Sequence, residues 1–71
     1  MKGRLNDTQY ELLEIIDTYI RDNGISPCIR EVMELSRLKS TSTIHANLEK
    51  LKEKGYISWR PGIPRTIRVI E

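Results

Sequence analysis

Short polar side chains cluster between residues 40 and 46 and offer the most specific chemistry in this sequence. The hydroxyl and imidazole groups of this segment donate and accept hydrogen bonds, and the methyl groups of Thr43 and Ala46 offer small apolar contacts. On the N-terminal part of a helix, such side chains suit the base edges in the major groove of DNA. We therefore expect base contacts from Ser42, Thr43, His45 and Ala46.

Basic residues surround this segment. The half of the chain up to Ser36 has four basic and seven acidic residues, and the half after it has eight basic and three acidic residues. This asymmetry is typical of a surface that faces a polyanion, although a solvated lysine-rich helix would explain the charge equally well. Backbone N–H groups at a helix N-terminus also bind phosphates, which adds Thr41. The expected phosphate contacts are Arg30, Lys39, Thr41, Arg60 and Arg65.

Several of these residues also have purely structural explanations. Ser40 is a good N-cap, and His45 would be tolerated as a solvated helix residue. Trp59 faces inward in its expected strand and should pack at the base of a hairpin. Cations near the C-terminal end of a helix interact favourably with the helix dipole, and they can do so from a solvated face. In the same helix these cations are Lys50, Lys52 and Lys54.

The residue inventory gives no support to an enzymatic or metal-dependent function. Cys28 is the only cysteine and His45 the only histidine, so a single chain cannot assemble a disulfide or a His/Cys zinc site. No glycine-rich phosphate loop is present, and no nucleophile is accompanied by a base and an orienting group. We expect no enzymatic activity, no cofactor and no bound metal.

Three helical segments are expected to position these residues. The first begins at Asn6, with Gln9 completing a capping box, and ends at Gly24. Its outer side is acidic and unsuited to nucleic acid, while its apolar side consists of Leu12, Ile15, Ile16, Tyr19 and Ile20. A shorter second helix follows Pro27, with Cys28 at the capping position. Its expected buried residues are Ile29, Val32, Met33 and Leu35.

The third helix is expected to begin at Ser40 and to stop at Gly55, after a turn over residues 36–39. Two helices joined by so short a turn form a helix-turn-helix. At about 100° per residue, one side of the third helix carries Ile44, Leu48 and Leu51 and is buried. The opposite side of this helix consists of Ser42, His45, Ala46 and Glu49.

Alternating side chains over residues 56–59 and 66–70 predict two strands, joined by a loop over residues 60–65 that contains two prolines. The predicted fold is α+β: a winged helix-turn-helix, with three helices followed by a two-stranded β-hairpin wing, in a single domain over residues 1–71. Neither a membrane-spanning apolar run nor a signal peptide is visible. We therefore expect a cytoplasmic protein.

The assembled segments resemble the N-terminal DNA-binding domain of the LexA repressor family, in its Gram-positive form. The resemblance covers residues 5–70. It rests on SPCIRE at 26–31, STSTIH at 40–45, LEKL at 48–51, KGYI at 54–57 and PRTI at 64–67. The chain departs from the family pattern at Arg37, where a turn glycine is common, and at Cys28, where Ser or Thr is common.

The resemblance implies a bacterial, nucleoid-associated repressor of the SOS response that binds palindromic operators with GAAC-type half-sites. It places the recognition helix over residues 40–54 and the base contacts at Ser40, Ser42, Thr43, His45 and Ala46. Full-length family members are homodimers inactivated by RecA-stimulated self-cleavage. The isolated domain is expected to be a monomer or weak dimer. These residues contain no Ala-Gly cleavage site or Ser-Lys dyad, so self-cleavage is not expected of them.

A second interpretation keeps the fold and changes the partner. A winged helix can dock a protein on its third helix instead of DNA. Salt distinguishes the two interpretations, because contacts to phosphates release counterions and weaken steeply as salt rises.

Overall fold

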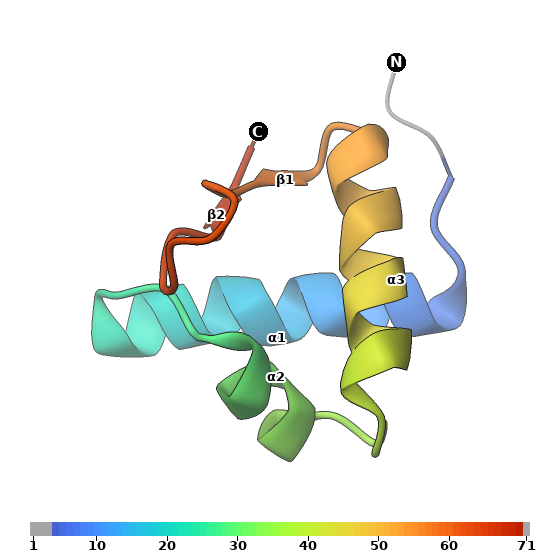
Figure 1. Ribbon diagram of the computed structural model, residues 1–71, viewed down its shortest axis with the longest axis horizontal. Coiled ribbons are helices and arrows are strands. Elements are labelled where there is room, and N and C mark those ends of the chain that lie inside the picture. Colours follow the sequence, from blue (N-terminus) through green and yellow to red (C-terminus); the bar gives the residue numbers. More distant parts are fainter. Residues whose placement is uncertain (1–3, 71) are drawn as a thin grey trace.

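The computed structural model describes residues 4–70 and contains three helices followed by a two-stranded antiparallel sheet (Figure 1). The elements are α1 (Asp7–Asn23), α2 (Ile29–Leu35), α3 (Thr41–Glu53), β1 (Ile57–Ser58) and β2 (Arg68–Val69). This is the predicted winged helix-turn-helix order. Among the described residues, no helix combines the length and apolar character needed to cross a membrane.

α1 begins and ends at the residues that the sequence predicts. The Asn6 side chain accepts a hydrogen bond from the Gln9 backbone N–H at 2.8 Å, and the Gln9 side chain accepts one from the Asn6 N–H at 3.3 Å. At the other end, Gly24 has a φ of 72° and its N–H donates to the Ile20 carbonyl. This left-handed conformation costs glycine no Cβ clash, and it ends the helix.

The core lies where α1, α2, α3 and the hairpin meet. All three residues of the predicted α3 stripe are fully buried, which fixes the rotation of this helix about its axis. The prediction for Leu35 is wrong, because this last residue of the short α2 is 57% exposed. Leu38, in the following turn, packs against the core instead. The buried apolar residues are Leu12, Ile16, Val32, Ile44, Leu48, Leu51, Ile57 and Ile67.

The turn between α2 and α3 closes through Ser36. The Ser36 N–H donates to the Val32 carbonyl at 3.0 Å, and the Ser36 hydroxyl accepts a hydrogen bond from the Leu38 N–H at 3.2 Å. Arg37 does not have a positive φ. This turn therefore needs no glycine, and the Arg37 side chain lies at the surface, 3.4 Å from the Glu11 carboxylate.

The side chains of the hairpin face the predicted sides, but its strands are shorter than predicted. Ile57 pairs with Val69 and is buried, and Ser58 pairs with the exposed Arg68. Ile67, one residue before β2, is also buried. The inward positions of the hairpin therefore close the core over α1 and α3.

The paired strands end early because a side chain replaces the next ladder hydrogen bond. The Thr66 hydroxyl accepts a hydrogen bond from the Arg60 N–H at 2.9 Å and lies 2.9 Å from the Ile63 carbonyl. Residues 60–65 thus form a loop closed on itself, which we call the wing loop. In Figure 1 the wing loop reaches back toward the connection between α1 and α2.

Candidate nucleic-acid interface

The start of α3 is built to leave backbone donors at the surface. The Ser40 hydroxyl accepts a hydrogen bond from the Thr43 N–H at 3.4 Å, which confirms Ser40 as the N-cap. The first N–H groups of a helix have no carbonyl partner within that helix. Because Ile44 is fully buried one turn later, the exposed helix start is held firmly against the domain.

The structure brings the predicted base-contacting residues together on one exposed surface. All five of them are exposed: Ser40, Ser42, Thr43, His45 and Ala46. We call the exposed side of α3 that carries Ser42, His45, Ala46 and Glu49 the α3 ridge. The first three of these side chains line a shallow hollow beside Ile29 of α2 and Thr41. This surface combines hydroxyl, imidazole and methyl groups, as contacts to base edges require.

Trp59 braces the base of the hairpin against α3. Its ring centroid lies 6.3 Å from that of His45, and the Lys52 ammonium lies 4.5 Å from the Trp59 ring centroid. His45 Nε2 is also 3.5 Å from the Glu49 carboxylate. The predicted packing of Trp59 is therefore confirmed, and the His45 ring is bordered by a carboxylate and an aromatic ring.

The lysines near the end of α3 differ in their surroundings. Lys50 is exposed and, within residues 4–70, pairs only with Glu53, at 3.8 Å, as expected for a solvated face. The Lys54 ammonium instead donates to the Gln9 side chain at 3.0 Å and to the Arg4 carbonyl, so it joins α3 to the start of α1. Lys52 and Lys54 therefore have structural partners that the sequence pattern does not indicate.

A groove of about 460 Å³ separates α3 from the wing loop. Its walls are largely apolar and include Ile29, Leu48 and Trp59. Arg30 and Arg60 also border it, from α2 and from the wing loop. The groove thus lies between the α3 ridge and the wing loop, and the side chains of Arg30 and Arg60 border it.

Three of the predicted phosphate-binding cations present their charges to solvent. Arg30, Lys39 and Arg60 are exposed, and their side chains have no hydrogen bond or ion pair within residues 4–70. They come from α2, from the turn before α3 and from the wing loop. Thr41, an uncharged residue that is also a predicted phosphate contact, is exposed at the start of α3.

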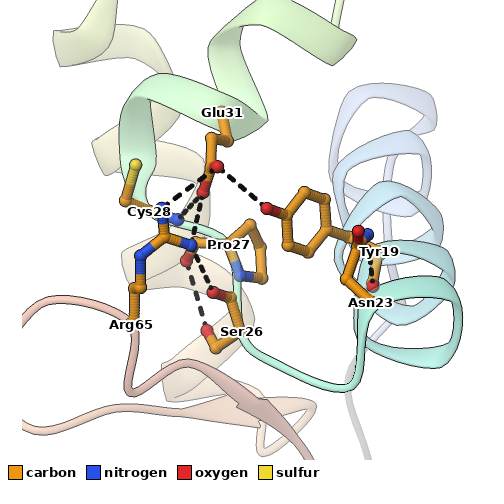
Figure 2. A network of polar contacts seen from close by, with 7 residues as sticks. All are labelled: Tyr19, Asn23, Ser26, Pro27, Cys28, Glu31 and Arg65. Atoms are coloured by element: carbon orange, nitrogen blue, oxygen red, sulfur yellow. Dashed lines mark hydrogen bonds and ion pairs between the residues drawn. The ribbon is translucent and has the colours of Figure 1, made fainter.

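Arg65 has different surroundings from the other predicted phosphate contacts (Figure 2). Its two terminal nitrogens lie 2.8 and 3.1 Å from the two carboxylate oxygens of Glu31, and Nη1 also donates to the Ser26 carbonyl at 3.2 Å. The same carboxylate accepts hydrogen bonds from the Tyr19 hydroxyl at 2.8 Å and the Cys28 N–H at 2.9 Å. We call these five residues the Glu31 network.

These contacts stabilise the charged form of Glu31. The Cys28 backbone N–H, followed by the Arg65 guanidinium and the Tyr19 hydroxyl, lowers the pKa of Glu31 to about 2. The carboxylate in turn raises the pKa of Arg65. Glu31 also supplies the capping interaction at the start of α2, which explains how Cys28 is accommodated at the capping position.

The sequence pattern does not reveal the Glu31 network. The position of Glu31, three residues after the capping residue, indicates only a local role at the helix start. Its partners Tyr19 and Arg65 lie 12 and 34 positions away along the chain. No short motif connects residues at such separations, so the network becomes visible only once the fold places α1, α2 and the wing loop together.

A helix with a fixed buried stripe, an exposed polar start and a hairpin beside it is the arrangement of a winged helix-turn-helix domain. Such domains present the second helix of the helix-turn-helix to the DNA major groove. Within this class the chain belongs to the family of the LexA DNA binding domain, whose family model matches residues 1–66. These residues therefore correspond to the DNA-binding domain of that family.

Curated relatives agree with this assignment. The chain is 44% identical over 71 residues to the LexA repressor of Caldicellulosiruptor saccharolyticus, covering 100% of this chain and 35% of that protein. It is 39% identical over 70 residues to the LexA repressor of Acetivibrio thermocellus, covering 99% and 33% respectively. For the LexA repressor of Halalkalibacterium halodurans the identity is 40% over 69 residues, covering 97% and 33%. The chain spans about a third of the length of these relatives.

Proposed function

We propose that this domain binds a half-site of a palindromic DNA operator and thereby represses genes of the SOS response to DNA damage. In this proposal α3 lies in the major groove, where Ser40, Ser42, Thr43, His45 and Ala46 contact base edges. The observation that carries the proposal is the exposed α3 ridge on a helix whose opposite side is fully buried. A rigid helix can hold short side chains in register with base pairs.

The proposed phosphate contacts follow from the cations that remain available. Arg30 and Lys39 would bind phosphates on the strand beside the start of α3, together with the backbone of Thr41. Arg60, across the groove on the wing loop, would reach a phosphate or the adjacent minor groove. The groove lies between these contacts, with Arg30 and Arg60 at its border.

The wider role follows the relatives, which are named LexA repressors. We propose that residues 1–71 act as one domain in the bacterial cytoplasm, at the nucleoid. By itself this domain would be a monomer or weak dimer. Joined to a C-terminal domain it would form a homodimer that occupies both half-sites and is inactivated through RecA.

Salt-dependent binding tests the proposal directly. The probe is a labelled duplex with a GAAC…GTTC palindrome, compared with a scrambled duplex of equal length over a series of salt concentrations. Each phosphate contact contributes about −0.9 to the slope of log K against log salt, so Arg30, Lys39 and Arg60 together predict a slope of about −3. The palindrome should bind more tightly than the scrambled duplex at every concentration.

The apolar groove favours one second candidate, a winged helix that docks a partner protein. That candidate predicts no duplex binding even at low salt. It also predicts binding of the domain to a protein with little dependence on salt, because apolar burial is not screened. Equal, salt-dependent binding to both duplexes would keep the DNA-binding function and overturn the proposed operator.

A further inference from the structure

We propose that Arg65 is a positioning residue for DNA binding, which fixes the wing loop through Glu31 and does not itself contact a phosphate. The inference rests on the proposed DNA-binding function and adds to it the residues that orient the wing. It also separates two arginines of the same loop, Arg60 and Arg65, which the sequence pattern treats alike.

The first support is the completeness of the pair between Arg65 and Glu31. Both carboxylate oxygens face guanidinium nitrogens, at 2.8 and 3.1 Å, which is the parallel two-bond geometry of the strongest arginine–carboxylate pairs. Nη1 additionally donates to the Ser26 carbonyl. To bind a phosphate through these nitrogens, Arg65 would have to leave a carboxylate and a carbonyl that it already contacts.

The second support is the number of elements that meet at one carboxylate. Glu31 belongs to α2, Tyr19 to α1 and Arg65 to the wing loop, and Figure 2 shows both side chains directed at the Glu31 carboxylate. Among the described residues, Arg65 makes the only side-chain hydrogen bonds from the wing loop to α2 and to the connection between α1 and α2. The position of the loop relative to α2 therefore depends on this residue.

The third support is the backbone of Arg65. Its φ is 57°, and it is the only residue other than glycine within residues 4–70 with a positive φ. L-residues enter this left-handed region at an energetic cost, and they stay there only where surrounding contacts hold them. Here those contacts are the bonds of the Arg65 guanidinium and the loop closure by Thr66.

The consequence concerns Arg60, at the other end of the wing loop. Its side chain is exposed and has no partner within the described residues. Since the loop is closed on itself by Thr66, holding one end also places the other. Arg65 thus sets where the Arg60 charge stands relative to the α3 ridge.

Substitutions separate positioning from phosphate contact. The affinity of the labelled palindromic duplex is measured over a salt series for Arg65→Gln, Arg65→Lys, Glu31→Gln and Arg60→Gln. Asp17→Asn serves as the matched control, because it makes the same charge change as Glu31→Gln and breaks an ion pair within α1 alone. Circular dichroism checks that each variant is folded.

Glu31→Gln gives the sharpest result because charge and positioning predict opposite signs. If charge alone matters, removal of a negative charge strengthens DNA binding. Asp17→Asn should therefore bind the duplex slightly more tightly than the parent. The proposal predicts a roughly three- to tenfold weaker affinity for Glu31→Gln and for Arg65→Gln. The variant that carries both substitutions should bind no more weakly than either single variant, because residues of one network are coupled. Arg60→Gln should reduce the magnitude of the salt slope by about 0.9, and Glu31→Gln and Arg65→Gln should each reduce it toward the same value, because they displace the Arg60 charge.

Arg65→Lys adds an independent discrimination. A lysine replaces an arginine well at a phosphate, but it cannot make the two parallel bonds to Glu31. The proposal therefore predicts that Arg65→Lys binds as weakly as Arg65→Gln. Near-parental binding by Arg65→Lys, a salt slope reduced by about 0.9 in Arg65→Gln but unchanged in Glu31→Gln, or tighter binding by Glu31→Gln would each overturn it.

Fluorescence without DNA distinguishes failure of this inference from failure of the proposed function. Trp59 is the only tryptophan and packs at the base of the hairpin. Its emission should shift in Glu31→Gln and in Arg65→Gln and stay unchanged in Arg60→Gln. If the parent bound no duplex, the proposed function would fail. Unchanged emission in all variants would overturn the inference.

Discussion

His45 lies in the middle of the exposed side of α3, and its neighbours limit how it can approach a base. Its ring is bordered by Glu49, which lies 3.5 Å from Nε2, and by Trp59. Glu49 also belongs to the α3 ridge, and a carboxylate in the major groove accepts a hydrogen bond from cytosine. In the proposed complex, His45 and Glu49 would offer a hydrogen-bond donor and an acceptor to neighbouring bases.

At the same scale, Glu31 makes the stability of the domain depend on pH. Because folding lowers its pKa from 4.5 to about 2, its contribution is complete above pH 4.5 and is lost as the pH falls toward 2. We predict that Glu31→Gln lowers Tm near neutral pH and that the Tm difference from the parent narrows over this interval. Thermal unfolding followed by circular dichroism at several pH values measures it.

Asp17→Asn is again the control, since exposed pairs within one helix contribute little to stability. Its Tm should stay close to that of the parent at every pH. A Tm difference between the parent and Glu31→Gln that remained constant from neutral pH to pH 2 would contradict the assigned pKa of Glu31.

At the residue scale, part of the candidate site can be predicted from the sequence and part cannot. The α3 ridge is predictable because its residues follow helix periodicity from the buried Ile44 and Leu48. The exposure of Arg30, Lys39 and Arg60 follows from their charge. The pairing of Arg65 is not predictable in this way, since it depends on a carboxylate 34 positions earlier and on an unusual backbone conformation.

At the scale of the element, the start of α3 has two roles that one substitution can separate. Ser40→Ala removes the hydroxyl that accepts the Thr43 N–H, and we predict a loss of about 0.5–1 kcal/mol in the free energy of unfolding. Ser40→Asp keeps a capping oxygen and should preserve stability, but its negative charge faces the DNA in the proposed complex. Urea unfolding and duplex binding measure the two effects.

The outcome for Ser40→Asp decides the orientation of α3. Weak duplex binding with parental stability is expected if the N-terminus of α3 approaches phosphates and bases. Parental binding by Ser40→Asp would show that the helix start points away from the DNA. Ser40→Ala then reports the capping contribution by itself.

Local signals predict the helices better than the strands. The bounds of α1 follow from Asn6 and Gly24, whose capping geometry is set by their own side chains or by the lack of one. The hairpin is shorter than alternation predicts, because the Thr66 hydroxyl takes the N–H of Arg60. Periodicity describes which side a residue faces, but it does not show where a side chain replaces a backbone partner.

At the scale of the whole molecule, the domain depends on a small core. By the usual 0.05–0.15 kcal/mol per residue, a chain of 71 residues has a stability of roughly 4–11 kcal/mol. Leu51 is fully buried in α3. We predict that Leu51→Ala costs about 2–5 kcal/mol, a large share of the total, because it leaves a cavity in the core. The urea midpoint measures this loss.

Ile63→Ala is the matched control for the core prediction. Ile63 is 53% exposed in the wing loop, so its removal should change stability by no more than about 0.5 kcal/mol. Equal losses for Leu51→Ala and Ile63→Ala would contradict the assignment of α3 as the helix that closes the core. Such a result would also remove the reason for a fixed α3 ridge.

The central claim is that the exposed side of α3 distinguishes base sequences. The most direct measurement is the preference for the GAAC…GTTC duplex over its scrambled form, at one salt concentration, for the parent, His45→Ala and Lys50→Ala. Lys50 is an exposed residue of the same helix outside the ridge. We predict that His45→Ala reduces the preference by about 1–3 kcal/mol and that Lys50→Ala leaves it unchanged. An undiminished preference in His45→Ala would contradict the claim.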